Sequence, residues 1–452
     1  MMRSINPYTG EEIEKFKQDS KSEVNKKIKK ADKAFEFWRM LSFEKRKQYI
    51  LKVAKVLASQ KNDFAAVISK EMGKPITQAI AEIEKCVWVC QYYAENAKKH
   101  LAKENIKTDA AESYITYEPL GVILAVMPWN YPFWQVFRFA IPALMAGNTC
   151  VLKHASNVMR SALNIEQVFK DAGLPEGCFE NLLISSKKVE HVITNKRIKA
   201  VTLTGSKPAG SEVAALAGRE IKKTVLELGG SNALLVFEDC DIDKTVDICV
   251  QARFQNTGQS CIAGKRLLVH DSIYLEFIEK FITKVRELKS GDPLEEDTFV
   301  GVMAKKEFAE NLESQLKASL KKGGKLVLGG KRNKSYFEPT VVIDVKKTSP
   351  IFKEETFGPV IGVTPFKNDM EAIDLLNATN FGLGASIFTK DLARAKAMIP
   401  HIQDGAVFIN GLVKSDPRLP FGGTKESGYG RELSVAGIRE FVNIKTVVIQ
   451  KG

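Results

Sequence analysis

The chain has 452 residues, 44% of them hydrophobic, and this length predicts two or three domains rather than one compact core. No run approaches the roughly 18 apolar residues of a membrane helix, and the first residues lack the apolar stretch of a signal peptide, so we expect a soluble cytoplasmic protein with no membrane partner. The formal net charge of +13 comes from lysines mixed with glutamates, which indicates solvated helix faces that attract anionic small molecules and argues against a nucleic-acid partner.

Seven cysteines are scattered along the chain without a CxxC pair. This distribution argues against a disulfide framework and against a zinc site, and it favours reduced thiols in a cytosol. His154 has no companion at a metal-ligand spacing, so we expect no metal ion.

Helical periodicity dominates the N-terminal part of the chain. Apolar residues recur at helical spacing from Val24 to Trp38, and the same period continues in three later segments. Those segments predict helices over residues 45–59, 64–72 and 77–99. A turn at Asn6–Gly10 precedes the helices, and a β-prone stretch at Ser113–Glu118 follows them. None of these segments carries a chemical signature, so they are interpreted as scaffold.

From Gly121 onward, short apolar runs alternate with helices. Strands are expected over 122–126, 149–153, 181–184 and 200–203 and, after a composition shift at 227–231, over 233–237, 266–269, 341–343, 360–363, 385–388 and 406–409. Helices are expected near 161–171, 242–254, 272–288, 301–322, 369–377 and 392–399. Wholly apolar strands that alternate with helices indicate a parallel sheet covered on both faces. We therefore predict an α/β fold with two parallel-sheet domains, plus two stray strands at 113–118 and 446–449.

Two segments offer the parts of a covalent-catalysis site. Cys261 ends the run Asn256–Cys261, where a thiol stands among small and polar residues. Glu227 ends an apolar run and is followed by Leu228–Gly230. A thiol can act as nucleophile and a nearby carboxylate as general base, so these residues are candidates for those two roles.

Three further segments follow the ends of predicted strands, where ligands gather in open parallel sheets. Asn130 carries an amide that could hold a developing oxyanion, and Lys153 could meet the ribose or phosphates of a cofactor. The stretch Gly205–Gly210 joins a strand to a helix, where free N–H groups attract phosphate. Its Gly-x4-Gly spacing is not the usual dinucleotide fingerprint. Asn130 and the stretch Gly205–Gly210 could also belong to ordinary turns, and Lys153 could be a snorkelling lysine.

Taken together and in order, the motifs resemble those of the aldehyde dehydrogenase superfamily over nearly the whole chain, from Asn6-Pro7 to the C-terminal strand. The most specific motifs are Pro128–Pro132, Glu227–Gly230, Gln259–Cys261, Glu355–Pro359 and Pro420–Glu432. The resemblance implies an aldehyde dehydrogenase-like fold with a variant Rossmann domain for the cofactor and a second α/β domain for catalysis. It further implies a small β element that joins subunits into homodimers or homotetramers.

The resemblance also suggests where these parts lie. The cofactor-binding domain is expected over residues 1–100 and 119–228, and the catalytic domain over 229–430. The bridging element is expected over 101–118 and 431–452.

The resemblance implies a role for each candidate residue. The Cys261 thiolate attacks the aldehyde carbon, the Asn130 amide and the Cys261 N–H hold the oxyanion, and Glu227 activates the water that hydrolyses the thioester. The residues expected to bind the cofactor are Trp129, Lys153, Ser156, Gly205, Ser206, Gly210, Leu228, Glu355 and Phe357.

The cofactor motif departs from the family at one position. Many members carry a glutamate three residues after the ribose lysine, whereas this chain has Ser156 three residues after Lys153. Losing the carboxylate removes repulsion against a 2′-phosphate, which Lys153 could also bind. We therefore expect NADP to be accepted and preferred, with NAD as the other cofactor.

Arg138, eight residues after Asn130, resembles the arginine that binds the substrate carboxylate in succinate-semialdehyde dehydrogenases. Its apolar sequence neighbours would otherwise surround an unpaired charge. Trp134 and Ser415 are further candidate substrate residues. Two departures leave the substrate open, because Gln255 replaces a frequent second arginine and Phe139 replaces a frequent lysine.

The expected activity is oxidation of an aldehyde, with succinate semialdehyde as the expected substrate. A neutral aliphatic or glyceraldehyde-type aldehyde is the main alternative. Acylation of coenzyme A is a third option, against which Glu227 argues as an apparent base. A non-catalytic cofactor-binding protein would share the fold, but it would not need Cys261, Glu227 and Asn130 together.

Overall fold

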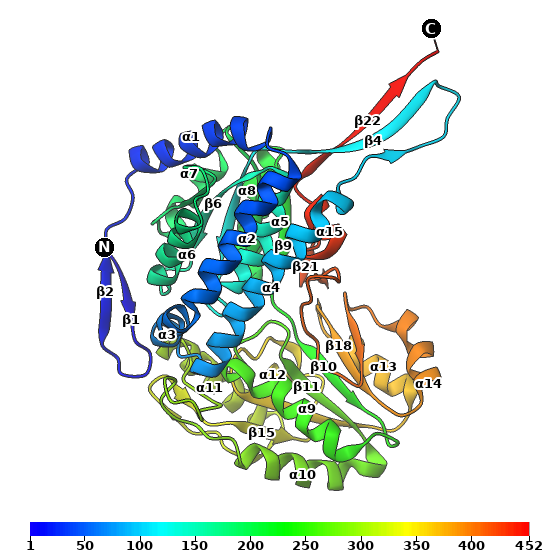
Figure 1. Ribbon diagram of the computed structural model, residues 1–452. Coiled ribbons are helices and arrows are strands. Elements are labelled where there is room, and N and C mark those ends of the chain that lie inside the picture. The colour runs from blue at the N-terminus through cyan, green and yellow to red at the C-terminus, as the bar shows by residue number, and fades with distance from the viewer. Residues whose placement is uncertain (452) are drawn as a thin grey trace.

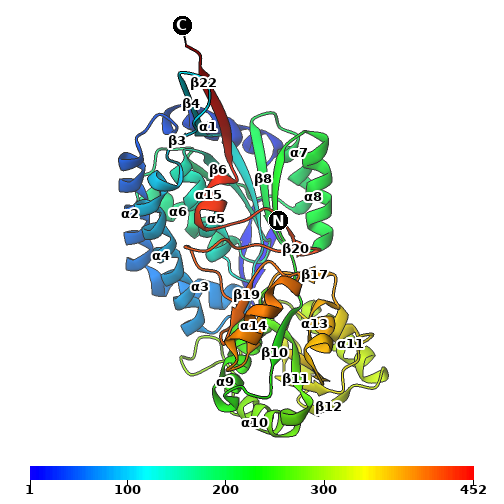
Figure 2. The same ribbon diagram turned by 90° about the vertical axis from the view of Figure 1, so that its right-hand side faces the viewer.

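The computed structural model describes residues 1–451. It contains two lobes, each built around one large sheet, and a small sheet that projects from the body (Figures 1 and 2). An antiparallel hairpin of β1 (Met2–Ile5) and β2 (Glu12–Phe16) lies on the flank of the first lobe. The predicted turn joins these two strands, and its Gly10 has φ +83°.

The first lobe holds a six-stranded sheet in the order β21-β9-β8-β5-β6-β7. Its parallel strands are β5 (Val122–Met127), β6 (Thr149–His154), β7 (Phe179–Asn181), β8 (Ile198–Thr204) and β9 (Lys223–Glu227). The edge strand β21 (Gly428–Tyr429) comes from the C-terminal part of the chain and pairs antiparallel with β9.

Helices cover both faces of this sheet, as the wholly apolar strands predict. One face packs against α2 (Phe43–Ser59), α3 (Lys61–Met72), α4 (Ile76–His100), α5 (Trp134–Ala146) and α6 (Met159–Asp171). The other packs against α1 (Lys21–Trp38), α7 (Val189–Ile193) and α8 (Lys207–Arg219). Helix α1 begins at a capping box, because the Ser20 and Glu23 side chains satisfy each other's backbone N–H groups.

The second lobe holds a seven-stranded sheet in the order β12-β15-β16-β11-β10-β18-β19. All neighbours are parallel except the pair formed by β12 and β15. The strands are β10 (Asn232–Val236), β11 (Gly264–His270), β12 (Lys325–Leu328), β15 (Thr340–Ile343), β16 (Val360–Phe366), β18 (Ala385–Phe388) and β19 (Val407–Ile409). On one face lie α9 (Ile242–Phe254) and α10 (Tyr274–Arg286), and on the other α11 (Lys306–Lys321), α12 (Pro350–Lys353), α13 (Asp369–Asn377) and α14 (Leu392–Met398).

The two stray strands of the sequence pair with each other. Strand β4 (Glu112–Pro119) lies between β22 (Val442–Ile449) and the short β3 (Glu104–Asn105) in an antiparallel sheet. This sheet extends away from both lobes (Figure 1), and α15 (Ser434–Arg439) connects it to the core of the first lobe. No helix among residues 1–451 combines the length and the apolar character needed to cross a membrane.

Most expected elements are present, with shifted ends. The helix expected from residue 301 begins only at Lys306, because the backbone at Gly301 and Ala304 hydrogen-bonds to side chains of the Asn256–Cys261 segment instead. The strand expected over 181–184 lies at Phe179–Asn181. Strand β9, which ends at Glu227, was not predicted. The division of the chain into domains at the expected boundaries stays a prediction.

Candidate active site

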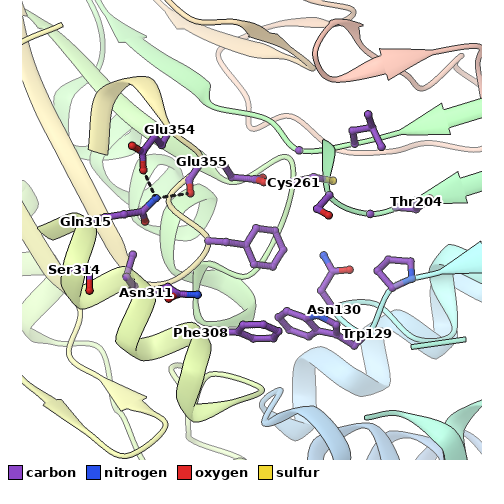
Figure 3. Close-up of a pocket in the computed structure, with 17 residues that line it drawn as sticks. Trp129, Asn130, Thr204, Cys261, Phe308, Asn311, Ser314, Gln315, Glu354 and Glu355 are labelled. Atoms are coloured by element: carbon purple, nitrogen blue, oxygen red, sulfur yellow. Dashed lines mark hydrogen bonds between the residues drawn. The ribbon is translucent and has the colours of Figure 1, made fainter. Parts of the chain in front are cut away.

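A cavity of about 770 Å³ opens where the ends of β5, β8 and β9 face the second lobe. Cys261 lines it together with Asn130 and Thr204, and Figure 3 shows these side chains on one side of the cavity. The opposite wall comes from α11 and from the segment after α12. The lining residues are Pro128, Trp129, Asn130, Thr204, Gly205, Ser206, Leu228, Gly229, Cys261, Phe308, Asn311, Leu312, Ser314, Gln315, Glu354, Glu355 and Phe357.

A second cavity, of about 460 Å³, also reaches Cys261. Trp134 and Arg138 line it from α5, one helical turn apart, and Ser415 lines it from the loop before Pro420. Lys85 of α4 lines it as well. Cys261 therefore lies where two cavities meet, so a ligand in either one can reach its sulfur.

The backbone before Cys261 is bent into an unusual turn. Asn256, Thr257 and Gly258 have φ of 54°, 55° and 70°, and a left-handed conformation is strained for a β-branched residue such as Thr257. Side-chain hydrogen bonds hold the turn. The Asn256 N–H donates to Gln78 Oε1 at 2.6 Å, and Thr257 Oγ1 accepts from the Gly301 N–H at 3.1 Å. The surrounding structure thus fixes where the nucleophile segment begins.

Cys261 is the one cysteine of the seven that is not buried. The burial of its surroundings raises the pKa of its thiol to about 11, and the cations of Arg138 and Lys265 oppose this rise. Glu355 and Glu227 add to it through their negative charges. The thiol is therefore accessible, but it depends on neighbouring cations to ionise.

Asn130 is buried beside the nucleophile. The Asn130 side-chain Nδ2 donates to the Gln259 backbone carbonyl at 3.1 Å, and the Asn130 backbone carbonyl accepts from Asn256 Nδ2 at 2.9 Å. An amide nitrogen carries two hydrogens, so one remains for a ligand oxygen in the cavity that Asn130 shares with Cys261. This arrangement fits an oxyanion donor.

Glu227 is buried at the end of β9, and its carboxylate makes no hydrogen bond within residues 1–451. Burial raises the pKa of Glu227 well above its usual range, and the nearby Glu432 raises it further, whereas Arg138 and Arg431 oppose the shift. Gly422 leaves room for this carboxyl, because a Cβ there would lie 2.8 Å from Oε1. Glu227 is not among the described residues that line either cavity.

Arg138 is buried and paired. Its Nε forms an ion pair with Glu432, and its Nη2 donates to Thr204 Oγ1 at 3.2 Å. Burial raises the pKa of Glu432, and Arg138 opposes this rise. Because Arg138 contacts Glu432 directly, we assign the negative charge of this cluster to Glu432 and the neutral carboxyl to Glu227.

Lys265 was not predicted as a functional residue. Its buried Nζ donates to the carbonyls of Gly230, at 2.5 Å, and Cys261, at 2.9 Å, and to Glu355 Oε1 at 2.8 Å. The only signal in the sequence is a pair of basic residues at the start of an apolar strand. Glu432 and Lys85 were missed too, because their partners are remote in the chain.

The expected cofactor residues lie in three places. Trp129, Gly205, Ser206, Leu228, Glu355 and Phe357 line the larger cavity. Gly210 packs behind it, where a Cβ would meet Leu228 at 2.6 Å. Lys153 is the penultimate residue of β6, and Ser156 lines a neighbouring hollow with Arg3, Lys305 and Lys306. Neither Lys153 nor Ser156 is among the described residues that line the larger cavity.

The larger cavity fits a dinucleotide. The first turn of α8 has no side-chain cap at Ser206, so its N–H groups are available to a phosphate. Trp129 stacks on Phe308 at 5.0 Å and meets Phe357 edge-on at 5.7 Å, which forms an apolar wall (Figure 3). Glu355 lies against Gly229, where a Cβ would be 2.3 Å from Oε2.

The family model described as the aldehyde dehydrogenase family matches residues 1–447. The chain belongs to the aldehyde dehydrogenase family. A probable succinate-semialdehyde dehydrogenase (NADP(+)) of Synechocystis sp. is 48% identical over 449 residues, which cover 99% of each chain. Succinate-semialdehyde dehydrogenase (NADP(+)) 1 of Mycobacterium tuberculosis is 46% identical over 452 residues, again 99% of each.

A solved structure supports the same family assignment. The succinic semialdehyde dehydrogenase of Streptococcus pyogenes, in complex with NADP+ as the cofactor, superposes with a TM-score of 0.97 and is 36% identical. The match covers 100% of both chains. The resemblance inferred from the motifs and the predicted fold class are confirmed.

Proposed function

We propose that this aldehyde dehydrogenase oxidises succinate semialdehyde to succinate and uses NADP in preference to NAD. The observation that carries the proposal is the position of Cys261, where a cavity that fits a dinucleotide meets a cavity lined by cations. Relatives at 46–48% identity bear the succinate-semialdehyde dehydrogenase name with NADP(+), which supports the same substrate and cofactor here.

In the first step, Cys261 Sγ forms a bond to the aldehyde carbon and the thiol proton is lost to solvent. Arg138 and Lys265 favour this ionisation through their charges. The resulting oxyanion accepts hydrogen bonds from Asn130 Nδ2 and the Cys261 backbone N–H. A nicotinamide dinucleotide held by the residues of the larger cavity would supply the hydride acceptor, and loss of hydride from this carbon leaves a thioester on Cys261.

In the second step, Glu227 takes a proton from water as the water oxygen bonds to the thioester carbon. The C–S bond then breaks, and the Cys261 thiolate leaves. Because the Glu227 carboxyl has no hydrogen-bond partner among residues 1–451, no such bond has to break when it turns toward the cavity. The pKa shift of Glu227 favours its neutral form, so this step should require a pH at which the group ionises.

The preference between NADP and NAD follows from the residues at and just after the end of β6. Lys153 carries a positive charge there, and Ser156 offers a hydroxyl where a glutamate would repel a 2′-phosphate. Lys305 and Lys306 line the hollow beside Ser156 and add positive charge. These features support NADP, with NAD as the weaker cofactor.

We also propose the expected domain division and a homodimer or homotetramer. The sheet of β3, β4 and β22 extends away from both lobes, which supports a separate bridging element. The oligomer is supported by apolar side chains that β22 leaves exposed, namely Ile444 at 59%, Val448 at 51% and Ile449 at 47%. Light scattering coupled to gel filtration tests the oligomer, and a monomer would reject it. A cytoplasmic location is supported by seven cysteines that are all free.

The deciding experiment compares initial rates with succinate semialdehyde and with butanal, each in NADP and in NAD. The two aldehydes share four carbons and differ by the terminal carboxylate. A kcat/KM that favours the acid at least tenfold is expected. Equal turnover of butanal would reject the substrate and favour a neutral aldehyde, with Arg138 serving only as the partner of Glu432.

A further inference from the structure

The segment between β5 and α5 carries Asn130, the proposed oxyanion donor. Trp129 and Asn130 from this segment line the larger cavity (Figure 3). On one side, the nucleophile segment holds Asn130 through hydrogen bonds to Gln259 and Asn256. An oxyanion donor has to be placed to within a fraction of an ångström, so the way in which this segment enters α5 also matters.

The backbone at the end of this segment needs a partner that the helix does not provide. Pro132 is buried, and the Val136 N–H, which a regular helix would offer to its carbonyl, donates to Phe133 instead. No backbone N–H among residues 1–451 donates to the Pro132 carbonyl. A buried carbonyl without a donor costs as much free energy as a lost hydrogen bond, so a side chain has to satisfy this one.

His154 provides that donor. It is the last residue of β6, it is fully buried, and its Nε2 lies 2.9 Å from the Pro132 carbonyl oxygen. The Ala155 N–H donates to Nδ1 at 2.9 Å, so Nδ1 is the acceptor and Nε2 carries the proton. Burial lowers the pKa of His154 to about 4, the hydrogen bond to Pro132 opposes this shift, and the Lys153 cation adds to it. The ring is therefore neutral at neutral pH, in a tautomer that its two partners fix.

A second buried side chain holds the residue after Pro132. Glu82 of α4 accepts from the backbone N–H groups of Phe133, at 2.8 Å, and Trp134, at 3.0 Å. The Pro132 carbonyl and the Phe133 N–H belong to the same peptide unit. His154 and Glu82 thus hold the two polar groups of one peptide unit, between the oxyanion donor and the helix.

We propose that His154 is a positioning residue for the oxyanion donor. Its imidazole holds the peptide unit two residues after Asn130, and this contact keeps the Asn130 amide beside Cys261. The inference rests on the proposed function, in which Asn130 stabilises the oxyanion, and deepens it by naming the group that places this amide. Both ring nitrogens are engaged, so His154 has neither a free lone pair nor a free proton for chemistry of its own.

Two amide variants separate the hydrogen bond from the bulk of the ring. In His154→Gln, the side-chain NH2 group reaches the position of Nε2 and can donate to Pro132. In His154→Asn, the shorter side chain still accepts from the Ala155 N–H, but it does not reach Pro132. The matched control is His401→Gln, which changes an exposed histidine.

Two reagents for Cys261 report the position of Asn130 without cofactor or aldehyde. p-Nitrophenyl acetate acylates the thiolate through a tetrahedral oxyanion, which leaves an acetyl thioester and releases p-nitrophenolate. Iodoacetamide alkylates the same thiolate by displacing iodide, and no oxyanion forms. The ratio of the two rates therefore reports the oxyanion donor, whereas a loss of thiolate or of access lowers both rates.

The acylation rate should fall by about 10- to 100-fold in His154→Asn, and the alkylation rate should change by less than about twofold. His154→Gln should recover most of the acylation rate, and His401→Gln should change neither rate. The burst of NADPH with an aldehyde should slow by the factor found for acylation, and the KM for NADP should change little.

Asn130→Ala tests whether the effect passes through the amide. In that background, His154→Asn should lower acylation by less than about a further twofold, because the group that it displaces is already gone. A loss as large as in the wild-type background would overturn the proposal. It would also be overturned if His154→Asn lowered acylation and alkylation equally, or left acylation unchanged. His154→Leu, which fills the space of the ring without a donor, gives the same comparison if His154→Asn does not fold.

The failure of the proposed function looks different. If the wild type oxidises neither succinate semialdehyde nor butanal but shows this pattern of acylation, the proposed function is wrong and the positioning role stands. If the wild type oxidises succinate semialdehyde and His154→Asn is acylated normally, only the positioning role is wrong. Acylation of the wild type no faster than that of Cys261→Ala would overturn the positioning role, because no oxyanion site would then exist beside the thiol.

Discussion

The Lys265 Nζ donates at 2.9 Å to the backbone carbonyl of Cys261 and at 2.8 Å to the carboxylate of Glu355. One buried ammonium thus connects the nucleophile segment to a residue on the wall of the larger cavity. Its charge also favours the Cys261 thiolate. The position of the sulfur and the position of the Glu355 side chain therefore depend on the same group.

Alkylation of Cys261 should depend steeply on pH. Burial raises the pKa of this thiol to about 11, so in the cofactor-free enzyme the thiolate fraction should rise about tenfold per pH unit up to that value. The rate of iodoacetamide labelling, read by mass spectrometry, measures this fraction. The other six cysteines are buried and should stay unlabelled. A plateau near neutral pH would contradict the expectation.

Lys265→Met should slow this labelling at every pH below the plateau and raise the KM for NADP. The variant removes a cation that lowers the pKa of Cys261 and a donor that fixes Glu355. A change of about tenfold is expected for the loss of one charge-assisted hydrogen bond. Lys289→Met, which removes an exposed lysine from an ion pair, is the control. Normal labelling in Lys265→Met would show that Lys265 does not influence the thiol.

Gly422→Ala should impair thioester hydrolysis more than thioester formation. Its Cβ would lie 2.8 Å from Glu227 Oε1 and 2.8 Å from the Gly430 carbonyl, so the carboxyl has to move. The expected result is a pre-steady-state burst of NADPH followed by a steady-state rate at least about tenfold below that of the wild type. Gly218→Ala, which adds a methyl group to open space at the end of α8, should leave both phases unchanged.

Glu432→Gln should leave Arg138 without its counter-ion. Breaking a buried ion pair by removing one partner costs about 3–5 kcal/mol, so urea unfolding should show a loss of this order. Replacing both residues, as Arg138→Met with Glu432→Gln, should recover much of the stability. If the single variant is as stable as the wild type, the pair is not a structural contact.

Glu432→Gln should also shift the pH dependence of thioester hydrolysis. Glu432 raises the pKa of Glu227, so its removal lowers that pKa and makes the base form available at lower pH. The acidic limb of the kcat profile is therefore expected to move toward lower pH. A limb that stays in place, or moves to higher pH, would show that Glu432 does not control the ionisation of Glu227.

Ser156→Glu should reverse the cofactor preference. A carboxylate near Lys153 would repel a 2′-phosphate, so the ratio of kcat/KM for NADP over NAD should fall by at least about tenfold. Ser156→Ala, which removes the hydroxyl without adding charge, should have a much smaller effect. Equal ratios in the two variants would show that repulsion does not set the preference.

The fold class could be predicted from the sequence because it depends on local pattern. Wholly apolar strands with intervening helices indicated two covered sheets. Asn130 and Cys261, which the motifs singled out, line one cavity, and their roles stay predictions. Helix α13 and strand β18 have the predicted ends. The late start of α11 could not be predicted, because the helix is replaced there by contacts to Thr257 and Gln259.

The charged partners could not be predicted for a related reason. Lys85 meets Ser415 across 330 positions of the chain, and Arg138 meets Glu432, which lies near the C-terminus of the chain. A periodic pattern places Lys85 on a helix that otherwise resembles scaffold. Only the folded arrangement shows that this lysine lines the same cavity as Cys261 and that Arg138 already has a partner.

The pairing of β21 with β9 has a consequence for synthesis of the chain. Strand β9, which carries Glu227, stays at an unpaired edge of its sheet until Gly428 and Tyr429 have left the ribosome. The first lobe also needs Leu433, Ile438 and Phe441 to complete its core. A nascent chain therefore cannot assemble the surroundings of its base before translation is almost finished, and a truncated product should be both inactive and prone to aggregate.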